Sequence, residues 1–205
     1  MVVQNTVDRR RLLRVLAAGA MLPAVPSVFA AGTSIGSVSE ITGEVSAELD
    51  GRSRKLKRKS ALFLNETVRT AARSRLRALL ARKTSLRLGA ETTVRIDRFI
   101  VDQGGELVLD SGALLIDTRG KLLKSLEVES PFALIAVRGT RFFAGPIDGI
   151  FGVFVARGAV DVTGGGRTVR LAAGQGTDIP RAGGPPGPVR TWGAPKIAKA
   201  MALVQ

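Results

Sequence analysis

The chain is divided into short apolar segments by glycine-rich turns, and this pattern constrains its fold more than any other feature of the sequence. Apolar and polar residues alternate in four segments: 94–100, 106–110, 113–118 and 123–128. Turn sequences fall between them or further along the chain: Gln103-Gly104-Gly105, Ser111-Gly112, Arg119-Gly120 and Asp148-Gly149. The triplet at 164–166 predicts the tip of a hairpin between segments 158–163 and 167–171. Short alternating segments separated by turns are typical of all-β proteins.

One segment allows two interpretations. Between Thr70 and Lys83, three leucines at positions 76, 79 and 80 have helical spacing, with arginines on the opposite side. On this spacing the segment would be a basic amphipathic helix. A strand followed by a turn agrees better with the rest of the chain, and we favour it.

Composition argues against an enzyme. Cysteine, histidine and tyrosine are absent from the 205 residues, although the 45% apolar content is sufficient for a core. Without histidine and cysteine there is no catalytic triad built on either residue and no zinc ribbon. The densest acidic stretch fits no paired-carboxylate motif or calcium loop, and its residues are Asp97, Asp102, Glu106, Asp110 and Asp117. We therefore predict a non-enzymatic protein with no catalytic residue, metal site or cofactor.

The first 30 residues are typical of an export signal. Arg9, Arg10, Arg11 and Arg14 precede a weakly apolar stretch at 15–22, and Val28 and Ala30, two positions apart, suggest cleavage before Ala31. The run from Asp8 to Arg14 is similar to a twin-arginine signal, although general secretion remains open. The apolar stretch is much shorter than the roughly 20 residues that cross a bilayer, so we expect no membrane span. The predicted location is the periplasm.

Positive charge is concentrated between Gly51 and Ala90. This segment contains thirteen lysine or arginine residues and one acid, Glu66. Such a charge distribution favours polyanions, although a solvated strand face is the simpler alternative. Nucleic acid is not expected, because only Phe63 is interleaved with the charges to stack on bases. The candidate anion-binding or partner-binding residues are Arg69, Arg73, Arg75, Arg77, Arg82, Lys83 and Arg87.

Residues 128–143 contain an arginine within an apolar strand pattern, in the order Ser130-Pro131, apolar residues, Ala136-Val137-Arg138-Gly139-Thr140 and two phenylalanines. Arg138 has two open roles. It could pair inside the fold with Glu129, Asp148 or Asp161, or it could face a groove and bind an anion. We expect Gly139 to permit a positive φ or a close backbone approach.

This segment resembles the central signature of the FecR family, and the order of elements over residues 33–180 is similar to that of a FecR domain. The matching pieces include Ile35-Gly36-Ser37-Val38, Asn65-Glu66-Thr67-Val68, Gly158-Ala159-Val160-Asp161-Val162 and Ala173-Gly174-Gln175. The resemblance implies a β-solenoid or β-roll of short stacked strands over residues 31–180. It also singles out signature residues with structural roles: Pro131, Arg138, Gly139, Thr140, Gly158 and Gly174.

The last residues predict a linker and a short C-terminal helix. Residues 181–195 are rich in proline and glycine and contain the only tryptophan, Trp192. Residues 196–205 place Ile197, Met201 and Val204 along one side of a helix. This helix could cap the open end of the β body, with Trp192 packed as an anchor, or it could dock on a partner.

The sequence therefore predicts a stand-alone FecR-type domain that binds or relays within an envelope signalling or assembly system. Signalling members of the family also carry a cytoplasmic anti-sigma segment and a membrane span, which we do not expect in this chain. The alternative function is binding of an envelope polyanion, such as acidic glycan, peptidoglycan or lipid phosphate, through the basic segment. The expected partner is an envelope protein or such a polyanion.

Overall fold

The computed structural model describes residues 33–205, apart from 82, 101–103 and 120–125. The predicted export signal therefore lies outside the described residues. Within them the chain forms eighteen strands and one helix. They are β1 (Ser34–Thr42), β2 (Val45–Leu49), β3 (Arg52–Lys55), β4 (Ala61–Phe63), β5 (Thr67–Thr70), β6 (Arg75–Leu80), β7 (Thr84–Leu88), β8 (Thr93–Ile100), β9 (Gly104–Ser111), β10 (Leu114–Thr118), β11 (Leu126–Glu129), β12 (Leu134–Val137), β13 (Arg141–Ile147), β14 (Ile150–Arg157), β15 (Ala159–Gly164), β16 (Arg167–Ala172), β17 (Gln175–Ile179), β18 (Arg190–Thr191) and α1 (Ala194–Val204).

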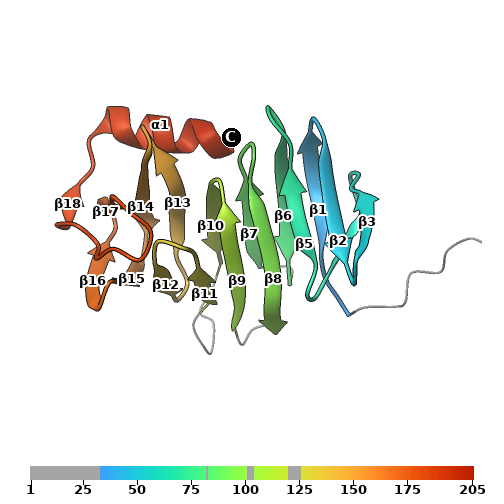
Figure 1. Cartoon of the computed structure of the whole chain (residues 1–205), viewed down its shortest axis with the longest axis horizontal. Coiled ribbons are helices and arrows are strands. Elements are labelled where there is room, and N and C mark those ends of the chain that lie inside the picture. Colours follow the sequence, from blue (N-terminus) through green and yellow to red (C-terminus); the bar gives the residue numbers. More distant parts are fainter. Residues whose placement is uncertain (1–32, 82, 101–103, 120–125) are drawn as a thin grey trace, which may run out of the picture. The chain divides into compact units, whose positions relative to one another are not determined.

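The strands form two nine-stranded sheets, which we call sheet A and sheet B (Figure 1). Sheet A has the order β18-β17-β14-β13-β10-β7-β6-β1-β4, and sheet B has the order β16-β15-β12-β11-β9-β8-β5-β2-β3. Among the described residues, neighbouring strands pair antiparallel, as β6 does with β7, apart from the parallel pair β9 and β11. The chain thus passes repeatedly from one sheet to the other while it advances along both. The prediction of a mainly β protein with a short C-terminal helix is confirmed.

The two sheets bury one apolar core between their facing sides. Side chains alternate between the two faces of a strand, so every second residue points into this core. In β7, for example, Leu86 and Leu88 are fully buried, whereas Arg87 between them lies on the opposite side. Sheet B contributes Ile96, Leu107 and others to the same cluster. The alternation seen in the sequence is therefore the alternation between the core and the outer faces.

The segment that allowed two interpretations is a strand, a turn and a second strand. β5 ends at Thr70, Arg73 adopts a positive φ of 56° in the turn, and β6 follows. Leu76 and Leu80 are buried in the core, whereas Leu79 is 41% exposed on the other face. The helical alternative is wrong, because pairing of β6 with β1 and β7 overrides the helical spacing of the leucines.

Several of the predicted turns mark the ends of strands. Gly112 and Gly149 have φ values of 82° and 81°, and β15 and β16 form a hairpin around the 164–166 triplet. Gly104 and Gly105 lie within β9 rather than in a turn. Residues 103 and 120–125, which include parts of a predicted strand and two predicted turns, lie outside the described residues.

The signature segment forms the turn between β11 and β12 and the connection from β12 to β13. The Ser130 hydroxyl donates to the carbonyl of Ala133 at 2.9 Å and accepts from the Ala133 N–H at 3.0 Å, which closes the turn that contains exposed Pro131. Gly139 has a φ of 69°, as expected, and β13 resumes the strand at Arg141 after the buried Thr140. These residues allow the chain to cross from sheet B to sheet A.

The other two signature glycines also have positive φ values. Gly158 has a φ of 86°, and a Cβ there would lie 2.7 Å from the methyl carbon of Thr140, so a larger residue would be strained and crowded. Gly174 has a φ of 83°, and its N–H donates to the carbonyl of Val155 at 2.8 Å.

The C-terminal residues pack on the face of sheet A that points away from sheet B. Helix α1 and Trp192 bury a second apolar cluster with Leu115, Phe143 and Phe154. Figure 1 shows α1 next to β13 and β14. The helix begins at Ala194, two residues earlier than predicted, because Pro195 in the first turn supplies a φ suited to a helix start. No helix within the described residues is long and apolar enough to span a membrane.

The basic segment also contains a buried ion pair. Glu66 is fully buried, and its Oε1 accepts from Nε and Nη2 of Arg54 at 2.9 and 2.6 Å. Its other oxygen accepts the N–H of Phe63 at 3.1 Å. Arg54 also donates to the carbonyl of Ala61 at 2.6 Å. This pair joins β3, on the edge of sheet B, to the segment around β4 in sheet A.

Candidate anion site on sheet A

The strand register arranges the outer face of sheet A in rows. In one row, Glu40 of β1 lies opposite Arg77 of β6, and Arg77 lies opposite Arg87 of β7. The row continues from Arg87 to Leu115 of β10 and then to Phe143 of β13. Leu115 and Phe143 are covered by the cluster around α1, whereas the charged half of the row remains open. The row therefore changes from apolar to charged near the end of the helix.

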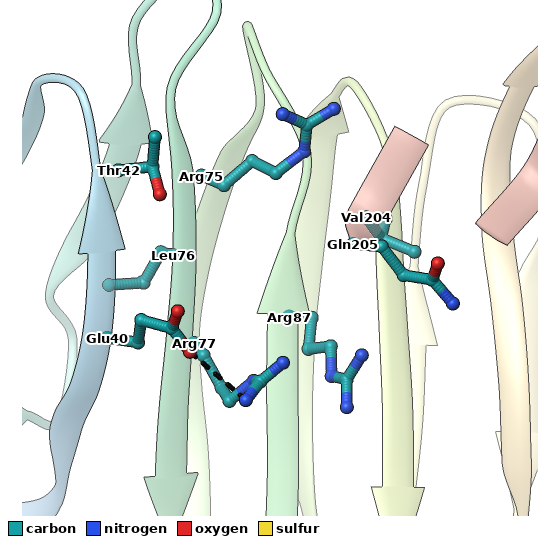
Figure 2. Close-up of a pocket in the computed structure, with 8 residues that line it drawn as sticks. All are labelled: Glu40, Thr42, Arg75, Leu76, Arg77, Arg87, Val204 and Gln205. Carbon is teal, nitrogen blue, oxygen red and sulfur yellow. Dashed lines mark ion pairs between the residues drawn. The ribbon is translucent and has the colours of Figure 1, made fainter. Parts of the chain in front are cut away.

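A hollow opens at the charged half of the row (Figure 2). Its volume is about 90 Å³. Figure 2 shows Arg77 and Arg87 on neighbouring strands and the end of α1 at one side of the hollow. The lining residues are Glu40, Thr42, Arg75, Leu76, Arg77, Arg87, Val204 and Gln205.

Three arginines line the hollow, and each has a different environment. Nη1 of Arg77 lies 3.1 Å from a carboxylate oxygen of Glu40. Nη2 of Arg75 donates to the carbonyl of Ala202 at 3.0 Å, which satisfies a carbonyl in the last turn of α1. Among the described residues, Arg87 has no hydrogen bond and no carboxylate within 4.0 Å. Nε of Arg75 and Nε of Arg77 are buried without an acceptor in the described structure.

The electrostatic environment disfavours the charge on Arg87. Partial burial lowers the pKa of its guanidinium, and the positive charges of Arg77 and Arg141 lower it further, while Asp117 and Glu40 oppose these effects. Arginine remains charged at neutral pH. Arg87 is therefore a cation held among cations, and an anion placed there would be stabilised.

A second row, one step along the strands, adds charge to the same face. Asp117 of β10 lies opposite Arg141 of β13, and Arg141 lies opposite Arg157 of β14. An oxygen of Asp117 accepts from Nη2 of Arg157 at 2.8 Å, and its other oxygen lies 4.0 Å from Nε of Arg141. Nε of Arg141 is buried without a hydrogen-bond acceptor in the described structure. One carboxylate is thus shared by two arginines.

The structure brings together only part of the predicted basic set. Arg75, Arg77 and Arg87 line the hollow on sheet A. Arg69 lies on β5 of sheet B, where it pairs with Glu48 at 2.6 Å. The remaining predicted residues are the exposed Arg73 and Lys83, which lie in turns, and Arg82, which lies outside the described residues. The basic segment is therefore divided between both sheets rather than forming one face.

Sequence analysis missed Arg141 and Glu40. Arg141 follows the signature Arg138-Gly139-Thr140 directly, and its outward position could have been inferred from alternation with the buried Phe142. Its position near Arg87 depends on the order of strands in sheet A, which no local pattern reveals.

Arg138 follows β12 directly and is exposed, so it is not buried in the core, and its pairing with a carboxylate stays a prediction. Two of the carboxylates considered as its interior partners make other ion pairs: Asp148 with Lys199 at 2.7 Å, and Asp161 with Arg170 at 3.8 Å. The role of Arg138 in binding an anion stays a prediction.

Trp192 is packed on the chain itself and is 6% exposed. Its ring stacks on Phe154 with a centroid distance of 5.2 Å, and Nζ of Lys196 lies 4.3 Å from its centroid. This is the packing expected of a capping anchor. Its docking on a partner stays a prediction.

The part of the chain that the structure describes contains no group of three or more histidine, cysteine or acidic residues that could hold a metal ion. The arginines of the hollow can donate guanidinium N–H groups to a ligand. Such donors bind anions, and they provide neither a nucleophile nor a general base near neutral pH.

Comparison with known proteins agrees with the strand pattern. Two crystal structures of a candidate anti-sigma factor from Parabacteroides distasonis ATCC 8503 each align with a TM-score of 0.55, at 19% and 18% sequence identity. Each alignment covers 64% of this chain and 62% of the other, and at this identity the likeness shows the fold alone. No curated protein matches the chain. Residues 66–161, slightly less than half of the chain, match the model of the FecR protein family.

Proposed function

We propose that this protein is a non-enzymatic component of an envelope signalling or assembly system, and that its FecR domain binds or relays in the periplasm. The observation that carries the proposal is the family match over residues 66–161. FecR domains are regulatory, and the solved structures with this fold are described as candidate anti-sigma factors, which supports a role in signalling. Absence of histidine and cysteine from the sequence supports a role without catalysis. The export-like N-terminus supports the periplasmic location.

The proposal includes a structural interpretation of the domain. The chain alternates between sheets A and B while it advances along both, which favours a β-roll made of successive short strands over residues 31–180. In this interpretation residues 181–195 are a linker that lies along the roll, and α1 caps it. The body would then present long outer faces suited to a protein partner.

Site-specific photo-cross-linking in intact cells tests the relay function. A photoreactive amino acid at Leu134, which is 41% exposed on the signature strand β12, should capture one envelope protein. The same amino acid at Arg167, at the hairpin tip between β15 and β16, serves as the control. A single partner from Leu134 that survives a high-salt wash supports the proposal. Equal, diffuse labelling from both positions contradicts it.

A second candidate function is binding of an envelope polyanion. The arginine row on sheet A favours it, because Arg87 lies near two other cations with no carboxylate partner in the described structure. Binding to acidic glycan or lipid phosphate would weaken steeply as salt rises, whereas a packed protein interface would not. Co-sedimentation with isolated envelope fractions at increasing sodium chloride distinguishes the two functions.

A further inference from the structure

Arg87 differs from the four arginines that lie near it on the outer face of sheet A. Arg77, Arg141 and Arg157 each lie within 4.0 Å of a carboxylate, and Arg75 donates to a carbonyl of α1. Arg87 has neither kind of partner among the described residues. A half-buried guanidinium without an acceptor loses hydration without a compensating hydrogen bond. The arrangement is unfavourable unless something outside the chain supplies the acceptor.

The strand register fixes Arg87 directly opposite Arg77. Neighbouring strands are about 4.8 Å apart, and like charges facing each other across them destabilise a sheet. An oppositely charged residue at either position would remove this repulsion. The two side chains are also long enough for both guanidinium groups to contact one small ion between them.

The hollow has the size and charge for such an ion. Its volume is about 90 Å³, whereas one water molecule needs roughly 10–15 Å³ on the same measure. The side chains that line it include three arginines and one carboxylate, so positive side-chain charge exceeds negative by two. We infer that this hollow is a binding site for a phosphate-type dianion, held by the guanidinium groups of Arg77 and Arg87.

Several features favour phosphate over a carboxylate or a long polymer. A carboxylate is satisfied by one arginine fork, whereas a phosphate has more oxygens and can accept from guanidinium groups on two strands. Arg141 adds attraction from two strands further along the sheet. The end of α1, at Val204 and Gln205, borders one side of the hollow and Glu40 another, so the ligand must be compact or present a single terminal phosphate. Free phosphate, a phosphate monoester and a lipid headgroup share this chemistry.

The inference deepens the second candidate function and rests on it for the biological source of the phosphate. It is independent of the relay function. Failure of phosphate binding would leave the cross-linking test at Leu134 unaffected. Conversely, a salt-sensitive attachment to envelope fractions that survives loss of Arg87 would support a diffuse polyanion surface and overturn the discrete site.

Calorimetric titration with sodium phosphate near pH 7.5, against sodium chloride at matched ionic strength, tests the site. We expect phosphate to bind in the millimolar range and chloride not to compete measurably. Arg87→Gln should weaken phosphate binding roughly 10- to 100-fold, because one charge-assisted hydrogen-bond donor is lost. Glu40→Gln should strengthen it, because a competing carboxylate is removed. Arg69→Gln is the matched control on sheet B and should change nothing.

Thermal melting separates loss of the site from loss of the fold. Arg87→Gln should melt at or above the wild-type temperature without phosphate, since it relieves like-charge repulsion. Phosphate should raise the melting temperature of the wild type and of Arg69→Gln, but not of Arg87→Gln. No preference of the wild type for phosphate over chloride would overturn the inference. Equal losses in Arg87→Gln and Arg69→Gln would overturn it as well, in favour of a diffuse basic surface.

Vesicles of phosphatidylcholine, with and without phosphatidic acid, identify the source of the phosphate. Binding that requires phosphatidic acid and is lost in Arg87→Gln supports the site with a lipid headgroup as ligand. Phosphate binding with no vesicle binding supports the site with a soluble phosphate ligand. Vesicle binding that is unchanged in Arg87→Gln, together with no binding of free phosphate, overturns it.

Discussion

The buried pair between Arg54 and Glu66 gives an asymmetric prediction for stability. Glu66 is fully buried, whereas the Arg54 side chain is 19% exposed. Removing one partner of a buried ion pair costs about 3–5 kcal/mol, because the other charge remains without its partner. After Glu66→Gln, the arginine can rotate toward solvent, so the free energy of unfolding should fall by about 3 kcal/mol. After Arg54→Met, the carboxylate has no path to water, so the cost should approach about 5 kcal/mol.

These free energies correspond to measurable shifts in melting temperature. For a domain of this size, 1 kcal/mol of destabilisation lowers the melting temperature by about 2–4 °C. We therefore expect decreases of about 6–12 °C for Glu66→Gln and about 10–20 °C for Arg54→Met. Glu48→Gln is the matched control, because Glu48 pairs with Arg69 at 2.6 Å in an exposed position. An exposed pair contributes about 0–1 kcal/mol, so the control should shift by at most a few degrees.

Urea denaturation followed by circular dichroism and by Trp192 fluorescence measures these changes. Coincident curves from the two probes would show that the body unfolds as one unit. The double variant Arg54→Met/Glu66→Leu should recover much of the loss, since an apolar pair leaves no buried charge. Equal costs for Glu66→Gln and Glu48→Gln would refute the reasoning. A smaller cost for Arg54→Met than for Glu66→Gln would refute the asymmetry.

Three further predictions follow from single contacts. Gly176→Ala places a methyl group against the ring of Trp192, so the tryptophan emission should shift to longer wavelength, and an unchanged spectrum would contradict the packing. Arg87→Glu should raise the melting temperature by about 0.4–4 °C through a new cross-strand ion pair worth about 0.2–1 kcal/mol, and a lower melting temperature would contradict the proposed repulsion. The hydrogen bond and charge of Lys55 lower the pKa of Glu44, so NMR should show Glu44 titrating below the ordinary glutamate range, with Lys55→Met returning its pKa toward that range. The stabilisation from this pair is present above the ordinary glutamate pKa and is lost as pH falls through the lowered one.

The sequence predicted where strands lie along the chain, but it did not predict which strands lie next to one another in the sheets. Alternation of buried and exposed residues identified β8 and β10 almost to the residue, because it reflects a sheet with one face on the core. Gly139 was expected to permit a positive φ or a close backbone approach, because glycine has no Cβ, and its φ is positive. The position of Arg138 was not predicted correctly, because the apolar residues around it in the sequence suggested that its charge lies inside the fold. The residue lies at the end of β12, where the chain leaves the sheet and its side chain reaches solvent.

The candidate site shows why the neighbours could not be predicted. Arg69 and Arg77 are eight positions apart in one basic segment, but β5 belongs to sheet B and β6 to sheet A. Arg87 and Arg141 are far apart in the sequence, but β7 and β13 are separated in sheet A by β10. Linear charge density therefore predicted an anionic ligand, but it grouped arginines that the structure places on two different sheets. Strand order depends on packing across the whole body, which a local pattern does not contain.

The position of the hollow follows from what α1 covers. The row from Phe143 to Glu40 changes from apolar to charged between Leu115 and Arg87. A helix lowers the free energy by covering the apolar half, and it gains nothing by covering the guanidinium groups. Gly89 allows the end of the helix to approach closely at this boundary, since a Cβ there would lie 2.5 Å from the carbonyl oxygen of Leu203. The last turn of α1 therefore lies beside the arginines, and Val204 and Gln205 line one side of the hollow.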